Sequence, residues 1–147
     1  MIIKLTLLAL FGIAMAHLEG VVVVYLRKAL GVGDVNSHAK LADVMPRPYL
    51  FIERTREAAT IIMLVIIAWL AGSAWLEKVI LFLWTFAFWD LFYYVSLYLL
   101  IKWPPSLKTL DVLFLIPVPW IAPVWFPLGM SALTILIIAV LYLTSFL

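Results

Sequence analysis

The chain has 147 residues, of which 67% are hydrophobic and 12% are charged, and its mean hydropathy is +1.20. Soluble domains carry about a quarter charged residues, so this composition excludes a soluble globular protein and indicates an integral membrane protein. The net charge of +2 provides no basic surface for nucleic acid, and the absence of cysteine excludes disulfides, thiolate metal sites and thiol redox chemistry.

The first apolar stretch, residues 3–26, is long enough to cross a bilayer as one helix. Its first half is similar to a secretory signal with small residues at a cleavage position, 14–16, but the apolar run then continues, which favours an uncleaved span. Gly12, Ala16 and Gly20 recur every four residues, a pattern that lets membrane helices approach closely. We expect this face to pack against another membrane subunit or a second copy of the chain.

A polar segment follows at residues 27–56 and holds six of the ten Lys and Arg residues. The positive-inside rule predicts that this loop is cytoplasmic and that both termini lie outside. Arg54, Arg56 and Glu57 fall at its end, where the second span begins. Two interpretations remain open for these charges: they anchor the helix end among lipid head groups, or they bind an anionic head group or cofactor at the mouth of the bundle.

Three further spans are predicted at residues 58–76, 79–101 and 127–146. The last span has few polar side chains and is expected to face lipid. Between the third and fourth spans, residues 103–126 contain several prolines and tryptophans, and the prolines prevent one continuous helix. We expect a re-entrant or interfacial segment there. The prediction is therefore an all-α, integral membrane four-helix bundle that forms one transmembrane domain over residues 1–147.

Asp90 lies at the midpoint of the third predicted span, where a carboxylate costs roughly 2.5–3.5 kcal/mol unless it faces protein, water or a ligand. Tyr93 and Tyr94 share its face of the helix. Counting from the inner helix ends at ~1.5 Å per residue places Glu19, His17 and Asp90 at similar depths, ~12 to ~18 Å into the membrane. Asp90 is therefore expected to meet either Glu19 or His17.

Three interpretations of these buried groups remain open. In the first, Asp90 is hydrogen-bonded to a neighbour and locks the helices together. In the second, Asp90 and Glu19 act as a general acid and base in an apolar pocket, with Tyr93 and Tyr94 orienting the substrate and His17 as a further catalytic candidate. In the third, His17 joins the carboxylates as a metal ligand, but one buried histidine is few for a transition metal, and we expect no metal site.

The sequence has no phosphate-binding glycine loop, dinucleotide fingerprint, nucleophile elbow or zinc-protease motif. We therefore expect a small accessory or assembly subunit of a larger membrane complex. The alternative is a membrane-embedded enzyme or binding protein for a lipophilic substrate, such as a lipid or quinone. A cavity that extends from Asp90 to Arg56 would favour this alternative. The cofactor stays unknown, because haem, pigment and quinone all remain open.

Overall fold

The computed structural model describes residues 2–31 and 46–144, and this part of the chain is mostly helical. Its elements in chain order are α1 (Ile2–Ala29), α3 (Arg47–Ala71), α4 (Trp75–Ile101), β1 (Leu110–Phe114), β2 (Trp120–Pro123) and α5 (Trp125–Leu143). Three helices, α1, α4 and α5, are long and apolar enough to cross a membrane. The fourth, α3, has a charged first half and is apolar only from Ala58 to Ala71.

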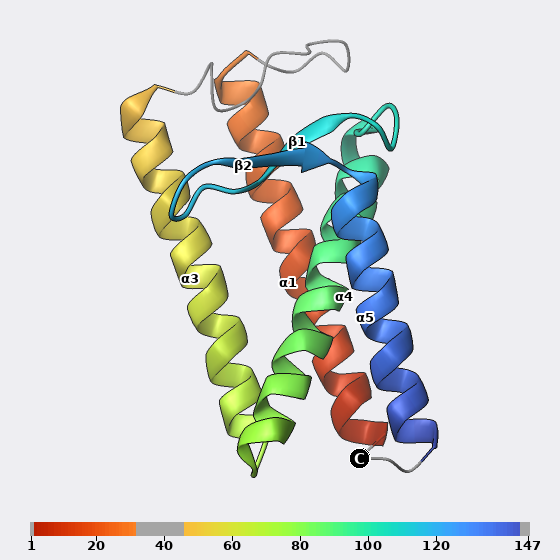
Figure 1. The fold of residues 1–147 in the computed structure, drawn as a ribbon. Coiled ribbons are helices and arrows are strands. Elements are labelled where there is room, and N and C mark those ends of the chain that lie inside the picture. The colour runs from red at the N-terminus through yellow and green to blue at the C-terminus, as the bar shows by residue number, and fades with distance from the viewer. Residues whose placement is uncertain (1, 32–45, 145–147) are drawn as a thin grey trace.

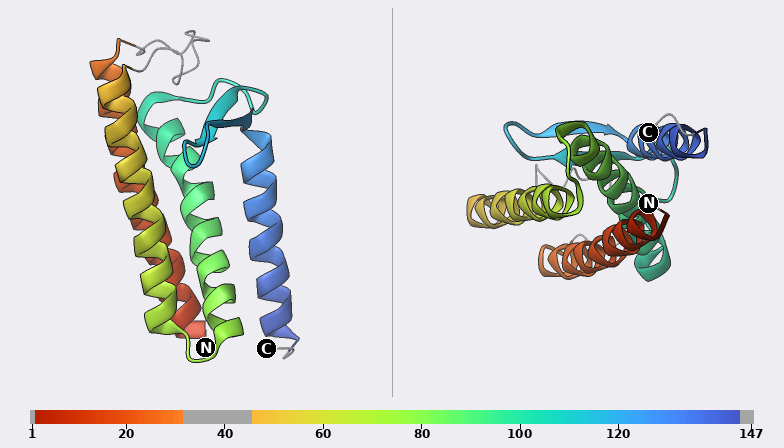
Figure 2. Two further views of the ribbon diagram at one scale, coloured as in Figure 1. Left: turned by 60° about the vertical axis from the view of Figure 1, so that its left-hand side comes forward. Right: turned by 90° about the horizontal axis from the view of Figure 1, so that it is seen from below.

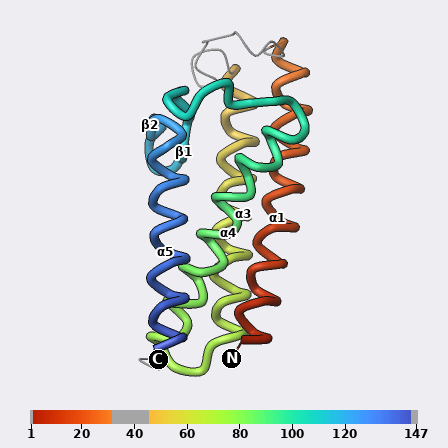
Figure 3. Tube along the Cα trace, turned by 90° about the vertical axis from the view of Figure 1, so that its right-hand side faces the viewer, coloured from red at the N-terminus to blue at the C-terminus, as the bar shows by residue number. Residues whose placement is uncertain are grey.

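The helices run lengthwise beside one another, and the two strands lie across one end of them (Figure 1). Helix α4 packs against each of the other three, with α3 and α5 on different sides of it (Figure 2). The start of α1 and the end of α5 lie at the end opposite the strands, together with the short turn between α3 and α4 (Figure 3). The end of α1 and the start of α3 therefore lie at the same end as the strands.

Small residues on α1 allow it to lie directly against α4. A Cβ atom added at Gly12 would lie 2.8 Å from the backbone oxygen of Thr85, and one added at Gly20 would lie 3.1 Å from Cβ of Ser96. Ala16, between the two glycines, is fully buried. We expected this face to receive another subunit or a second copy, but α4 of the same chain covers it. The small residues thus serve packing within the chain.

All four helices contribute to an apolar core near the turn between α3 and α4. Its buried members are Leu5, Leu8, Ala68, Leu81, Trp84 and Ile138. Two polar contacts fix the same region: the indole of Trp84 donates to the carbonyl oxygen of Leu5 at 2.9 Å, and Lys4 pairs with Glu77 at 2.6 Å. The helices are therefore closely packed at this end, while the cavities described below lie towards the strands.

The segment that we expected to be re-entrant or interfacial, residues 103–126, contains an antiparallel β-hairpin. Asp111 lies opposite Ala122 and Val112 lies opposite Ile121. The prolines in the turn prevent a helix, while the β-branched and aromatic residues on either side suit strands. Pairing also satisfies backbone groups that would otherwise lack hydrogen-bond partners. The chain is thus not all-α, although its strands are short.

Two boundaries of α3 differ from the sequence prediction. The helix ends at Ala71 rather than at residue 76, because the chain turns at Gly72 before α4 begins. It starts at Arg47, inside the stretch 27–56 that was predicted as a loop. The charged residues at the end of that stretch therefore lie on a helix, so residues three or four positions apart share one of its faces. Residues 32–45 of the predicted loop lie outside the described residues.

Candidate functional site

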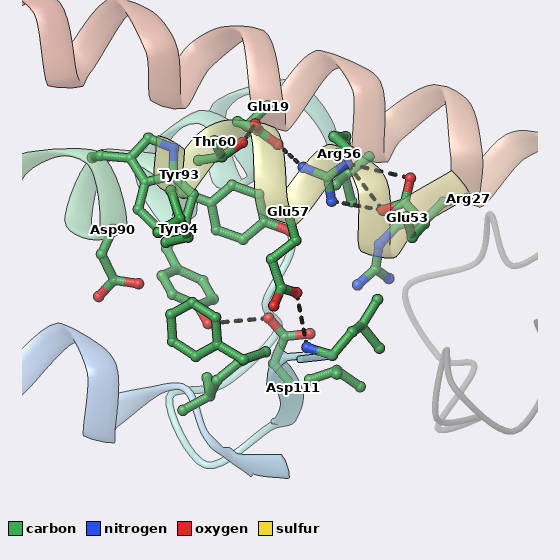
Figure 4. Close-up of a pocket in the computed structure, with 17 residues that line it drawn as sticks. Glu19, Arg27, Glu53, Arg56, Glu57, Thr60, Asp90, Tyr93, Tyr94 and Asp111 are labelled. Carbon is green, nitrogen blue, oxygen red and sulfur yellow. Dashed lines mark hydrogen bonds and ion pairs between the residues drawn. The ribbon is translucent and has the colours of Figure 1, made fainter. Parts of the chain in front are cut away.

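The hairpin and helices α1, α3 and α4 surround a cavity of about 80 Å³, here called the polar cavity (Figure 4). The carboxylates and guanidinium groups that line it belong to Glu19, Arg27, Glu53, Arg56, Glu57, Asp90 and Asp111. Neutral polar side chains add Thr60, Trp89, Tyr93 and Tyr94. The volume is several times the ~10–15 Å³ that one water molecule needs, so the cavity has room for waters or for the polar group of a ligand.

Arg56 of α3 is held between two buried carboxylates. Glu19 of α1 forms an ion pair with Arg56 and accepts a hydrogen bond from the hydroxyl of Thr60. Arg56 also donates to Glu53 Oε2, from Nε at 3.0 Å and from Nη2 at 2.6 Å. Because buried charges are stable only with partners, this network ties α1 to α3 at the level of the polar cavity.

Asp111 of β1 forms the floor of the cavity on the hairpin side. Its Oδ2 accepts a hydrogen bond of 3.0 Å from the hydroxyl of Tyr94, which is buried on α4. Burial raises the pKa of Asp111 to about 6, although the charge of Arg27 and the hydrogen bond from Tyr94 act in the opposite direction. Asp111 therefore exchanges its proton close to neutral pH.

Glu57 attaches the tip of the hairpin to α3. Its two carboxylate oxygens accept hydrogen bonds from the backbone N–H groups of Leu115 and Ile116, at 2.8 and 3.0 Å. These two donors follow β1 directly, where the strand pairing ends. A charged acceptor for two adjacent amides is a strong contact. The hairpin is thus held over the cavity from the α3 side.

Two hydrogen-bond donors in the polar cavity have no acceptor among the described residues. They are Nε1 of Trp89 and Nε of Arg27, and both atoms are buried. The guanidinium of Arg27 lies over the ring of Trp103, 4.2 Å from its centre. A buried donor without an acceptor costs about 1–3 kcal/mol, so these positions favour a bound molecule that carries acceptor oxygens.

A second cavity, of about 250 Å³, lies between α4, α5 and the hairpin, and is here called the apolar cavity. It is lined by Leu83, Phe86, Ala87, Asp90, Leu113, Phe114, Trp120, Phe126, Pro127, Met130, Ser131 and Thr134. Asp90 is the ionisable residue in this set. The hydroxyl of Ser131 on α5 donates to Asp90 Oδ2 at 2.7 Å. Asp90 also lines the polar cavity, so this residue borders both cavities.

The structure brings together some of the residues singled out in the sequence and separates others. Those that line the polar cavity are Glu19, Arg56, Glu57, Asp90, Tyr93 and Tyr94. His17 and Arg54 are exposed and line neither cavity. Each is two residues from a cavity residue, Glu19 or Arg56, which turns it to the opposite side of its helix. Asp90 hydrogen-bonds to Ser131 and not to Glu19 or His17.

The sequence analysis assigned no role in the site to five of its residues: Arg27, Glu53, Thr60, Asp111 and Ser131. The spacing of Glu53, three residues before Arg56, indicated a shared helix face but not a buried ion pair. Ser131 was interpreted as part of a lipid-facing helix, yet it is buried against Asp90. The positions of Thr60 and Asp111 depend on how distant segments pack, and no local pattern indicates them.

Comparison of the chain with protein-family models, with curated proteins and with solved structures gives no match. Function is therefore inferred from the two cavities and from the residues that line them.

Proposed function

We propose that the protein is a multi-pass membrane protein that binds a lipophilic molecule in the apolar cavity and exchanges a proton with it through Asp90. The observation that carries this proposal is the position of Asp90 between the two cavities. Asp90 borders one cavity lined mainly by aromatic and aliphatic side chains and a second cavity lined by charged and polar groups. The second cavity is lined by both Asp90 and Arg56, and a cavity between these two residues was expected to favour an enzyme or binding protein over an accessory subunit.

The size and lining of the apolar cavity suit a lipophilic ligand. Its volume of about 250 Å³ exceeds the ~150 Å³ of an engineered apolar cavity that binds benzene. Phe86, Phe114, Trp120 and Phe126 supply flat apolar surfaces around it. Ligand sites in proteins are generally apolar with a few placed polar groups, and here Asp90 and its neighbour Ser131 would be those groups.

Asp90 is placed to act as a general acid or base. The hydrogen bond from Ser131 is made to Oδ2 and orients the carboxyl group, which leaves Oδ1 for a ligand. The polar cavity has room for waters that would resupply or remove the proton. Proton transfer needs only a group within hydrogen-bond reach of the reacting atom, so one carboxyl group is sufficient for this chemistry.

We assign Glu19 a positioning role, which differs from the acid and base pair that the sequence suggested. Glu19 lines the polar cavity only, and its carboxylate is engaged by Arg56 and Thr60. Tyr94 is likewise engaged, since its hydroxyl donates to Asp111. The first contact joins α1 to α3 and the second joins α4 to β1, so together they fix the elements around Asp90.

In this proposal all four helices cross the membrane, with residues 27–56 on the cytoplasmic side and both termini outside. The six basic residues of that stretch support the orientation. The common location of the start of α1 and the end of α5 is compatible with an even number of crossings (Figure 3). A reporter fused after Leu147 should be detected outside, and a cytoplasmic signal would contradict this topology.

An accessory or assembly role in a larger membrane complex stays a prediction. Exposed leucines along α5, such as Leu133 and Leu136, suit lipid and a partner helix equally. They therefore do not favour that role over ligand binding.

The proposal is tested by purifying the protein from its native membrane in a mild detergent and identifying extracted lipophilic molecules by mass spectrometry. Thr134→Trp places an indole ring in the apolar cavity, whereas Leu133→Trp places it on an exposed position of the same helix. We expect one molecule to co-purify with the wild type and with Leu133→Trp, and to fall at least tenfold in Thr134→Trp. Equal recovery from both variants, with equal thermal stability, would refute the proposal.

A further inference from the structure

We infer that the bound molecule carries an uncharged oxygen group, a hydroxyl or a carbonyl, at the end that meets Asp90, and that the site excludes phosphate-bearing lipids. This inference rests on the proposed function and specifies its substrate class. The charges and the unbonded donors of the polar cavity support it independently of each other.

The balance of charge around the polar cavity opposes an anionic head group. Five carboxylates and two guanidinium groups line the cavity, which leaves a formal excess of three negative charges. Arg56 is already paired with Glu19 and Glu53, so its charge is compensated within the protein. A phosphate placed near Asp90 would be repelled by several carboxylates, while Arg56, one of the two cations that line the cavity, is already engaged by Glu19 and Glu53.

The second cation of the cavity, Arg27, does not change this balance. Its guanidinium is stacked on Trp103, and its charge acts on Asp111. Arg54, which the sequence suggested as part of an anion site with Arg56, is exposed and lines neither cavity. Arg54 and Arg56 therefore do not line one cavity together.

The two donors without an acceptor indicate that the ligand carries a hydrogen-bond acceptor. Trp89 Nε1 and Arg27 Nε are buried, line the polar cavity and have no acceptor among the described residues. A hydroxyl group can donate to Asp90 and accept from Trp89, and a carbonyl group can accept from both when Asp90 is protonated. An amine would be attracted by the negative charge, but a protonated amine has no lone pair for these donors.

The relative sizes of the two cavities indicate the shape of the bound molecule. The apolar cavity is about three times as large as the polar one, at about 250 Å³ against about 80 Å³. Asp90, Leu113 and Phe114 line both. A molecule with one compact oxygen group and a larger hydrocarbon body fits this division, whereas a large polar head does not.

The inference is tested by photolabelling the full chain in phosphatidylcholine nanodiscs. Two probes carry a diazirine on a dodecyl chain, one with a terminal hydroxyl and one without any polar group, and labelled residues are mapped by mass spectrometry. Unlabelled dodecan-1-ol, dodecan-2-one, dodecylamine and dodecyl phosphate then compete with the hydroxyl probe. We expect the alcohol and the ketone to compete at least tenfold better than the amine and the phosphate.

Two variants test the donor directly. Trp89→Phe removes one buried donor and should weaken labelling by the hydroxyl probe about 2- to 10-fold, while labelling by the hydrocarbon probe stays unchanged. Trp125→Phe, at an exposed position near the start of α5, is the matched control and should change neither.

The outcomes separate this inference from the proposed function. Competition by dodecyl phosphate or dodecylamine that equals that of the alcohol would overturn the substrate class and leave lipophile binding intact. Hydroxyl-probe labelling that is unaffected by Trp89→Phe would also overturn it. If neither probe labels residues of the apolar cavity more strongly in the wild type than in Thr134→Trp, the proposed function itself fails.

Discussion

Replacing Arg56 by methionine would remove the one cation that Glu19 and Glu53 share. Both carboxylates are buried, with exposed fractions of 7% and 5%, so the variant would leave two uncompensated buried charges. Breaking a buried ion pair by removing one partner costs about 3–5 kcal/mol. The Arg56 side chain is 27% exposed, which favours the lower end of this range. A loss of about 3 kcal/mol corresponds to roughly a 150-fold fall in the ratio of folded to unfolded protein.

The assay is reversible unfolding in mixed micelles at pH 7, with helix content measured by circular dichroism. Arg54→Met is the matched control, because Arg54 is an exposed arginine on the same helix, and its change should stay within about 0.5 kcal/mol. The combined variant Glu19→Gln, Glu53→Gln, Arg56→Met should recover most of the lost stability, because no buried charge remains. A cost below about 1 kcal/mol for Arg56→Met would refute the idea that this network holds α1 to α3.

Three other predictions concern the hairpin and the helix packing. The raised pKa of Asp111, about 6, means that the folded protein binds this proton more tightly than the unfolded chain does. The free energy of unfolding of the wild type, measured relative to that of Asp111→Asn, should be highest below about pH 4, and this stabilising effect should be lost by about pH 6. Free energies of unfolding that run parallel for the two proteins across this pH range would contradict the prediction. Gly12→Ala should destabilise the protein by about 1–3 kcal/mol, because the new Cβ would lie 2.8 Å from a backbone oxygen, whereas Gly129→Ala, with nothing within 4 Å, should not. Glu57→Ala should speed hydrogen exchange at the amides of Leu115 and Ile116 by about tenfold or more, and unchanged exchange would show that Glu57 does not hold the hairpin.

The helical part of the fold could be predicted because run length and composition are local properties. The spans predicted at 3–26, 79–101 and 127–146 lie within or close to α1, α4 and α5. The hairpin was missed because prolines show where a helix cannot form but not what forms instead. Strand pairing depends on two segments that meet, and neither segment alone shows a strong pattern.

In the candidate site, too, local features could be predicted from the sequence, while contacts between distant segments could not. The cost of burying a charge directed attention to Asp90, which lines both cavities, and helix periodicity placed Tyr93 and Tyr94 on its side of the helix. Its actual partner, Ser131, could not be inferred, because depth estimates compare only α1 with α4 and give no information about α5. The pairing of Glu19 with Arg56 also depends on how α3 is placed beside α1, which no sequence pattern specifies.

The most direct measurement of the central claim is the infrared absorption of the Asp90 carboxyl group when a ligand binds. The protein in nanodiscs would be titrated with dodecan-1-ol, and difference spectra would be recorded in the carboxyl region. We expect a difference band in the wild type that is absent in Asp90→Asn and retained in Asp111→Asn. Saturable binding of dodecan-1-ol with no band that depends on Asp90 would contradict the claim that this carboxyl group contacts the bound molecule.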